Sequence, residues 1–375
     1  MSTRFGKWIA GKFSFKLFLT LFVLSMGFAA YETDSALCQL TGRAHFYGAV
    51  YILFAFIAIL IVTKEKEMVK WHHPVYTKIL RFLSCFLIYD LLALSVWEML
   101  CRILRISAQW KATGVFCVAG ISALAVLIGF LHTKTIRVKR YDIDIGRRIV
   151  PYRIALISDI HLGIFVGEAH IAKIVRKINE LSPDIVVIAG DLFDVDRAFL
   201  NRTKELQHIS GLLRRIQARE GVYAVAGNHD PSPSDKAFAH FLRASNITLL
   251  DDESRRLSRM VLVGRTDGAH RARKPYADVI GQAETDLPIV VLDHDPQGIR
   301  ESARSGASLV LCGHTHRGQL FPITVLTRWA NGKKRFYGHV QYGRTHGIIT
   351  SGAGFFELPV RIGTDNEIVD LHLRV

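Results

Sequence analysis

The sequence predicts an α/β domain preceded by an all-α transmembrane region of about four helices. Half of the 375 residues are hydrophobic, and nearly all of the long apolar runs lie before residue 140. The remainder alternates short apolar runs with amphipathic stretches, which is the pattern of α/β domains. The chain is also longer than one typical domain. We therefore expect a transmembrane region at 1–132, a linker or edge strand at 133–150 and a globular domain at 151–375.

Four apolar stretches are each close to the ~20 residues that cross a bilayer as a helix. They cover residues 15–31, 46–62, 79–101 and 113–132. A soluble bundle of this size could not cover four helices that lack a polar face, so the stretches are interpreted as membrane spans. The first stretch also has the basic start and the small residues near Ala29 and Ala30 that are typical of a signal peptide.

The positive charge is concentrated in the same part of the chain. Residues 1–140 carry 17 Lys and Arg against 6 Asp and Glu, whereas residues 141–375 carry 31 against 27. The excess positive charge therefore lies mainly in loops next to the membrane and not on the globular domain. For this reason nucleic acid is not expected as a partner. The tail before the first stretch, the second loop and the segment after the fourth stretch are basic, whereas the first loop has only Arg43. The positive-inside rule then predicts a multi-pass protein of the cell membrane with its globular domain in the cytoplasm.

Five short apolar runs in the globular part have the length and β-branched content of buried strands. Each is followed at once by side chains that bind hard or borderline metals. The five strand ends are Asp159-Ile-His161, Gly190-Asp191, Gly227-Asn228-His229-Asp230, Asp293-His294-Asp295 and Gly313-His314-Thr-His316. Amphipathic helices are expected at 168–181 and 202–219, so the strands should pair in parallel.

Open parallel sheets carry their sites at the carboxyl ends of the strands, so these groups should enter one crevice. Glycines at 190, 227 and 313 permit the tight turns at these ends. A single Asp or His after a strand is usually a helix cap, a turn residue or a loop residue. Five such ends in one chain point instead to a metal site. The five cysteines show no pairing pattern or metal-type spacing, so neither a disulfide scaffold nor a Cys-based zinc site is expected.

These motifs, in this order, resemble those of the calcineurin-like metallophosphoesterases over about residues 150–375. The second motif reads Gly190-Asp191-Leu-Phe-Asp194 in full. The closing segments Thr350-Ser-Gly-Ala-Gly-Phe and Pro359-Val-Arg-Ile-Gly, followed by Glu367-Ile, are similar to those of the subgroup in which membrane helices precede the enzyme. The resemblance implies a four-layer αββα sandwich with two facing mixed sheets and a dimetal site on loops at one end.

The resemblance also implies a role for each motif residue. Asp159, His161 and His316 would hold the first metal ion. Asn228, His294 and His314 would hold the second, and Asp191 would bridge both. His229 would lie beside the metals without binding them, and Asp230 is a candidate for orienting it. Asp194, Asp293 and Asp295 are expected to be turn, solvent or supporting residues rather than ligands.

Oxygen and nitrogen ligands together suit manganese, iron or zinc better than calcium, and manganese is favoured for the two divalent metal ions. Such a pair clamps a phosphate and supplies a metal-activated hydroxide that attacks phosphorus. His229 would then stabilise the developing charge or protonate the leaving oxygen, with Asp230 or another carboxylate orienting it.

The resulting hypothesis is hydrolysis of a phosphoester or pyrophosphate bond in a membrane- or lipid-linked substrate. Some relatives hydrolyse the pyrophosphate of UDP-2,3-diacylglucosamine, which makes this kind of nucleotide lipid the most concrete candidate. A phosphodiesterase or nuclease for soluble or nucleic-acid substrates remains open, although the near-neutral domain argues against it. A non-catalytic membrane scaffold also remains open, although the ligand set is complete. Many relatives carry glycine where this chain has Arg317, which could reach a second phosphate or be an exposed arginine.

Overall fold

The computed structural model describes residues 74–145, 150–194, 203–280 and 286–375, together with isolated positions between 27 and 42. The chain folds as two compact units, Met1–Ile128 and Gly129–Val375. The predicted apolar stretch 46–62 lies outside the described residues, and the stretch 15–31 lies largely outside them. The expected number of four spans therefore stays a prediction.

Two long apolar helices in the described part of the chain contain the other two predicted stretches. Helix α3 spans Pro74–Ile103 and helix α4 spans Ala108–His132. By length and composition, Thr77–Ile103 and Ala108–His132 could each cross a membrane. At the turn between the helices, Glu98 pairs with Arg102 at 2.8 Å and with Lys111 at 2.6 Å. The Glu98 carboxylate, which lies within the predicted stretch 79–101, is therefore paired with two cations.

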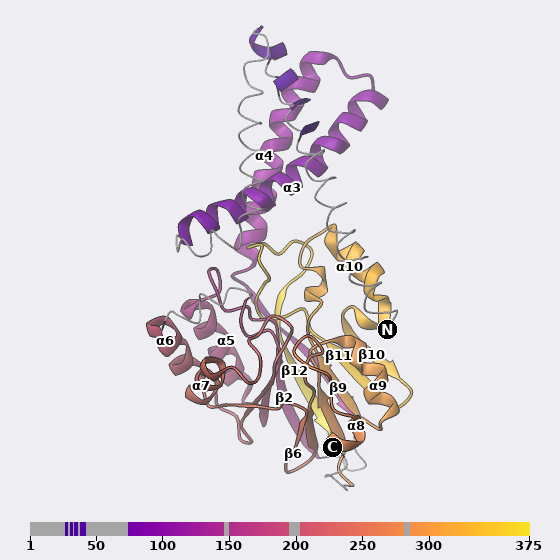
Figure 1. Cartoon of the computed structure of the whole chain (residues 1–375). Helices are drawn as coiled ribbons and strands as arrows, with labels where there is room; N and C mark the ends of the chain where they lie inside the picture. Colours follow the sequence, from indigo (N-terminus) through magenta and orange to yellow (C-terminus); the bar gives the residue numbers. More distant parts are fainter. Residues whose placement is uncertain are drawn as a thin grey trace. The chain divides into compact units, whose positions relative to one another are not determined.

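The second unit contains two mixed sheets of six strands each (Figure 1). The first sheet has the order β1 (Ile136–Asp144), β12 (Asn366–Arg374), β2 (Pro151–Ile157), β3 (Ile185–Ala189), β4 (Val222–Val225) and β5 (Ile247–Leu249). The second has the order β10 (Gly338–Tyr342), β11 (Thr345–Ile349), β9 (Leu309–Cys312), β8 (Ile289–Leu292), β7 (Val261–Gly264) and β6 (Glu253–Arg256). The parallel pairing expected between the ligand-bearing strands is confirmed for β2, β3 and β4 and for β8 and β9.

Side chains on successive residues of a strand point to opposite faces, and this alternation builds the layers. On β2, Ile154 and Leu156 enter a core shared with the second sheet, whereas Ala155 and Ile157 enter a core on the other face. The second sheet behaves in the same way, since Leu311 faces the shared core and Val310 faces outward. The two sheets therefore pack face to face.

Helices cover the outer face of each sheet. Helices α5 (Glu168–Leu181), α6 (Thr203–Leu213) and α7 (Lys236–Ala244) pack on the first sheet and lie together in Figure 1. The short helices α8 (Tyr276–Ile280) and α9 (Ile299–Arg304) supply residues to the outer core of the second. The layers are thus helix, sheet, sheet and helix, as the resemblance implied. Further along the chain lie helix α10 (Ile323–Asn331) and the short 3-10 helices η3 (Pro296–Gly298), η4 (His316–Gly318) and η5 (Lys333–Arg335).

Two local expectations are refined by the structure. The helix expected at 202–219 ends at Leu213. The stretch 133–150 contains an edge strand, because β1 runs over nine residues and pairs in parallel with β12. The expected helix at 168–181 has the predicted bounds.

Candidate metal centre

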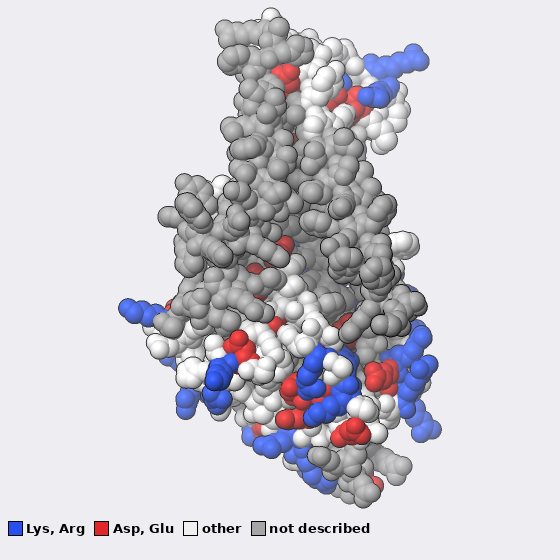
Figure 2. All heavy atoms as spheres, in the orientation of Figure 1, with Lys and Arg blue, Asp and Glu red and all other residues white. Residues whose placement is uncertain are grey.

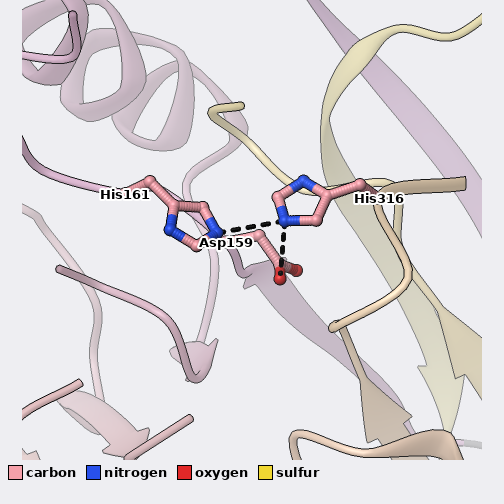
Figure 3. A group of neighbouring side chains, drawn as sticks. All are labelled: Asp159, His161 and His316. Atoms are coloured by element: carbon pink, nitrogen blue, oxygen red, sulfur yellow. Dashed lines mark hydrogen bonds and ion pairs between the residues drawn. The ribbon is translucent and has the colours of Figure 1, made fainter. Parts of the chain in front are cut away.

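The loops that follow β2, β3, β4, β8 and β9 bring their side chains to one place. Asp159, His161 and His316 form a first group, in which one ligand atom from each residue lies within 4.8 Å of the others. The Nε2 atoms of His161 and His316 are 3.0 Å apart, and the Nε2 of His316 is 3.4 Å from Oδ1 of Asp159. Figure 3 shows the two imidazoles facing each other through these nitrogens, with the Asp159 carboxylate beside them.

A second group of the same kind consists of Asp191, His294 and His314. The side-chain oxygen of Asn228 joins it, at 2.9 Å from Nδ1 of His314 and 3.1 Å from Nε2 of His294. The amide oxygen, the carboxylate and the two ring nitrogens thus converge on one point. This group contains the residues that were expected to hold the second metal ion.

Asp191 lies between the two groups. Its Oδ2 atom is 3.1 Å from Nε2 of His294 and 3.8 Å from Nε2 of His161. One carboxylate therefore faces a histidine of each group, which is the position a bridging ligand needs. The structure brings all seven predicted ligands together, and their role in binding metal stays a prediction.

The chemistry of these donors fits divalent cations. The Nδ1 atoms of His161 and His316 are buried and have no hydrogen-bond partner in the described part of the chain. The facing Nε2 atoms of His161 and His316 can share only one proton. Together with the nearby carboxylates they offer more hydrogen-bond acceptors than donors, which a bound cation would balance. Burial lowers the pKa of His161 to about 3, which keeps the imidazole neutral at pH 7. Neutral imidazoles and carboxylates are the form in which these groups bind metals.

Hydrogen bonds with backbone groups orient the candidate ligands. Nδ1 of His294 donates to the carbonyl of Ala189 at 2.7 Å, which leaves Nε2 free as a ligand atom. The backbone N–H of His314 donates to the Asp159 carboxylate at 3.0 Å. The backbone N–H of His229 donates to Oδ1 of Asp191 at 2.9 Å. The loops therefore fix the carboxylates of both groups.

Five of the seven candidate ligands have a left-handed backbone. Their φ values are 51° for Asp159, 52° for His161, 52° for Asp191, 74° for His314 and 49° for His316. Residues other than glycine rarely adopt this conformation, and each instance costs on the order of 1–3 kcal/mol. Backbone strain that is concentrated at one set of strand ends is typical of a functional site. The surrounding fold must hold these residues in place, and here the result is that their side chains converge.

The three glycines at the strand ends serve two purposes. Gly190 has a φ of +83°, so it supplies the expected tight turn. Gly227 and Gly313 are not among the glycines with a positive φ, so the turns that follow them do not depend on a left-handed glycine. A Cβ atom on Gly227 would lie 2.2 Å from Oδ1 of Asp191, and one on Gly313 would lie 1.7 Å from the Ser158 hydroxyl. These two glycines allow the ligand loops to approach each other.

His229 and Asp230 are placed differently from each other. The ring of His229 is 5.4 Å from that of His161 and 4.6 Å from that of Phe356, beside the two groups. The buried Asp230 accepts hydrogen bonds from the backbone N–H groups of Phe193 at 2.8 Å and Gly227 at 2.9 Å. Among the described residues no hydrogen bond joins Asp230 to His229. Asp230 therefore braces the loops of Asp191 and Asn228, which is a positioning role.

The other carboxylates of the motifs lie outside both groups. Oδ1 of Asp194 is 3.8 Å from Nδ1 of His161. Asp293 is buried and makes two 2.7 Å hydrogen bonds with Arg273. Asp295 caps η3 by accepting from the N–H of Gln297. The guanidinium of Arg317 lies 4.5 Å from the centre of the Tyr337 ring, which gives that side chain a packing partner.

Arg361 supports the site and had no role in the sequence interpretation. Only 1% of its surface is exposed. Its guanidinium donates to the carbonyl of His316 at 3.1 Å, to that of Ser351 at 2.7 Å and to Oδ1 of Asn366 at 2.7 Å. Burial lowers the pKa of Arg361 to about 10, so the side chain stays charged at pH 7. The sequence does contain one sign of this role. Arg361 stands between the apolar residues Val360 and Ile362, and such neighbours indicate that its charge is buried.

Replacing Arg361 by leucine is expected to destabilise the protein by about 3 kcal/mol, because several buried acceptors lose their donor. The melting temperature should fall by about 6–12 °C for a unit of this size. Thermal unfolding of the purified full chain measures this change. The control is Arg374→Ala, since Arg374 is an exposed partner of Asp144 on the edge strand and should leave the melting temperature unchanged. An Arg361→Leu variant as stable as the parent would contradict the support role.

The four layers and the two facing groups of carboxylate, amide and imidazole donors define an α/β domain with a candidate site for divalent metal ions. Residues 152–318 match the family model of the calcineurin-like phosphoesterases, so this part of the chain is a domain of the metallophosphoesterase kind. The metal-binding character of the family agrees with the two groups of candidate ligands.

Related proteins with curated names share the domain. The chain is 32% identical over 261 residues to a transmembrane protein with metallophosphoesterase domain of Danio rerio, covering 63% of this chain and 57% of that protein. It is 29% identical over 245 residues to an uncharacterized metallophosphoesterase of Helicobacter pylori, covering 63% and 64%. The chain thus spans less than two thirds of the length of these relatives. A solved 5'-nucleotidase precursor of Thermus thermophilus aligns at 15% identity and a TM-score of 0.37, over 60% of this chain and 55% of that one.

Proposed function

We propose that this protein is a membrane-attached, metal-dependent phosphoesterase that hydrolyses a phosphoester or pyrophosphate bond. The observation that carries the proposal is the convergence of seven donor side chains from five strand ends on two adjacent points. Asp159, His161 and His316 would hold one divalent ion and Asn228, His294 and His314 the other, with Asp191 between them. Such ions supply Lewis acidity at the phosphate and a water of lowered pKa.

The protein itself supplies orientation and charge stabilisation. Asp230 and the His229 backbone hold the loop of Asp191, so its carboxylate faces both groups without rearrangement. The imidazole of His229 would lie next to the leaving oxygen of a bound phosphoester, where it stabilises the developing charge or protonates the oxygen. Phe356 packs on this imidazole and limits its orientations.

The proposed substrate is lipid-linked. Two candidate spans within the described residues attach the enzyme to a bilayer, and attachment raises the effective concentration of substrates confined to the same surface. A nucleotide lipid of the UDP-2,3-diacylglucosamine type is the most specific form of this proposal, with the hydrolase domain in the cytoplasm. A nucleic-acid substrate is disfavoured because the described face of the second unit in Figure 2 mixes both signs of charge.

Removal of metal tests the proposal. Treating the purified full chain with a chelator should lower hydrolysis of bis(p-nitrophenyl) phosphate by at least about 100-fold, because the Lewis acid is lost. Adding manganese should restore the rate, and zinc or iron in its place shows which ion serves. Full activity in protein shown by elemental analysis to be metal-free would refute the proposal.

A substrate panel then tests the lipid assignment separately. Nucleotide lipids, lipid phosphates and small soluble phosphodiesters are offered to the metal-loaded full chain in bilayers. Preference for the first two supports a lipid-linked substrate. Activity confined to soluble phosphodiesters would remove the lipid assignment and leave the phosphoesterase proposal intact.

A further inference from the structure

Helix α10 carries its apolar side chains on the face that is exposed to solvent. Val325, Leu326 and Trp329 lie on one side of the helix and are 57%, 62% and 86% exposed. The opposite side carries Thr324 and Thr327, which are half-buried. A surface helix of a soluble domain normally has the reverse arrangement. This helix therefore presents an apolar face that the domain does not cover.

In the part of the second unit that the structure describes, exposed large apolar side chains are concentrated on this helix and the residues just before it. After the end of α4 at His132, six large apolar side chains of the described residues are exposed. One is Val138 on β1, and the other five are Phe321, Ile323, Val325, Leu326 and Trp329. We call these five residues the α10 face. Five exposed large apolar side chains within nine residues are a concentration of the kind that binds an apolar partner.

The charges around the α10 face identify the partner. Arg328 is on the helix, and the exposed Lys333, Lys334 and Arg335 follow it directly. The sequence from residue 318 to residue 356 contains no Asp or Glu. Apolar side chains including tryptophan, flanked along the sequence by basic and not by acidic residues, are the composition of helices that lie in the surface of an anionic membrane.

The position of the helix also fits a bilayer. The last turn of α4, which belongs to the second unit, contacts residues 360–362, since the N–H of Arg361 donates to the carbonyl of Gly129 at 3.0 Å. The N–H of Phe321 donates to the carbonyl of Ile362 at 2.9 Å. One segment therefore contacts both the end of a candidate span and the start of the α10 face. A bilayer crossed by α4 would end close to this segment.

We propose that α10 is an interfacial helix that inserts its apolar face into an anionic lipid leaflet beside the end of α4. This would be a second membrane attachment, independent of the spans and of any hydrolysis. Because η4, which contains the candidate ligand His316, ends three residues before Phe321, the attachment would also hold the metal centre at the lipid surface. Lipid-linked phosphates could then reach the site without leaving the bilayer.

Quenching of Trp329 fluorescence tests the insertion directly. The full chain and its Trp329→Phe variant are placed in nanodiscs of phosphatidylcholine and phosphatidylglycerol, with or without bromine on the acyl chains. The emission lost on substitution is the Trp329 signal, because the other four tryptophans are common to both proteins. Bromine should reduce this signal about twofold or more, since quenching requires burial of the ring at the acyl boundary.

A Trp329 signal that bromine does not change overturns the proposal. If that unchanged signal also shifts to shorter wavelength as the protein concentration rises, the α10 face binds a second copy of the chain instead of lipid. Quenching that is equal with and without phosphatidylglycerol would overturn the anionic part of the assignment. None of these results depends on enzymatic activity, so they test membrane insertion independently of the proposed function.

A pair of charge variants tests the consequence for catalysis, which rests on the proposed function. Leu326→Asp should lower hydrolysis of p-nitrophenyl hexadecyl phosphate in bilayers about tenfold, because the metal centre is no longer held close to the lipid-confined substrate, and leave bis(p-nitrophenyl) phosphate in water unaffected. The matched control is Val138→Asp, which charges the one other exposed large apolar residue among those described after His132 and should change neither rate. An equal fall with both substrates, or no fall with either, would contradict the role of the helix.

Discussion

Replacing Asp191 by alanine should abolish activity, lowering kcat/KM by at least about 1,000-fold, and should empty the metal centre. Oδ2 of Asp191 faces His294 and His161, one from each candidate group. Its removal leaves both groups without their shared carboxylate and takes one negative charge from a buried set of donors. Oδ1 also anchors the backbone of His229, so the loop that carries Asn228 loses a hydrogen bond. Metal binding and loop order should therefore fail together.

Elemental analysis and kinetics on the same protein preparation measure this outcome. Asp191→Asn should behave like the alanine variant, because the amide keeps the shape and removes the charge. The control is Asp295→Ala, which removes a carboxylate next to His294 that caps η3 and contacts neither group. Should Asp191→Ala keep its metal content and an activity within a factor of ten of the parent, the seven-residue centre would be wrong.

The strands and donors of this centre were predictable because their signals are local. β2, β3, β4, β8 and β9 are short apolar runs that end in the donors themselves, so one pattern gives both the strand and the site. Buried parallel strands must have such runs, because both of their faces are covered. The pattern does not show how a donor is oriented. The role of Asp230 depends on the backbone of Phe193, which no spacing in the sequence relates to it.

The errors in the fold have non-local causes. The helix expected to reach residue 219 stops at Leu213, although Ile216 remains buried in the same core and continues the apolar periodicity. Asn179 of α5 stabilises the chain beyond that end, donating to the carbonyl of Arg215 and accepting from the N–H of Gln217, each at 2.9 Å. A tertiary contact therefore ends the helix, and helical periodicity alone does not reveal it.

The α10 face shows a second limit of sequence patterns. A run with apolar residues at 323, 325, 326 and 329 has the same periodicity whether the helix packs on a core or faces outward. Only the partial burial of Thr324 and Thr327 decides the direction. The edge strand β1 is a similar case, since its partner β12 begins at Asn366, which is 230 residues away from Ile136. Pairing over that distance leaves no local signal.

Replacing His229 by alanine should lower kcat by about 100- to 10,000-fold, the usual contribution of a positioned proton donor, while metal content stays at the parent level. The ring of His229 lies beside the ligand groups, with its centre 5.4 Å from that of His161. Its backbone N–H holds Asp191 and is kept in the alanine variant. The variant should therefore keep the metal centre and lose only the group that acts on the leaving oxygen.

Two diesters that differ in their leaving group separate the possible actions of His229. p-Nitrophenolate leaves readily without a proton, whereas an alkoxide does not, so a proton donor matters far more for the alkyl ester. If His229 protonates the leaving oxygen, His229→Ala should reduce hydrolysis of the alkyl diester much more than that of bis(p-nitrophenyl) phosphate. An equal loss on both substrates would assign the imidazole to charge stabilisation at phosphorus. A loss of metal together with activity would instead make His229 part of the metal-binding framework and contradict its position beside the two groups.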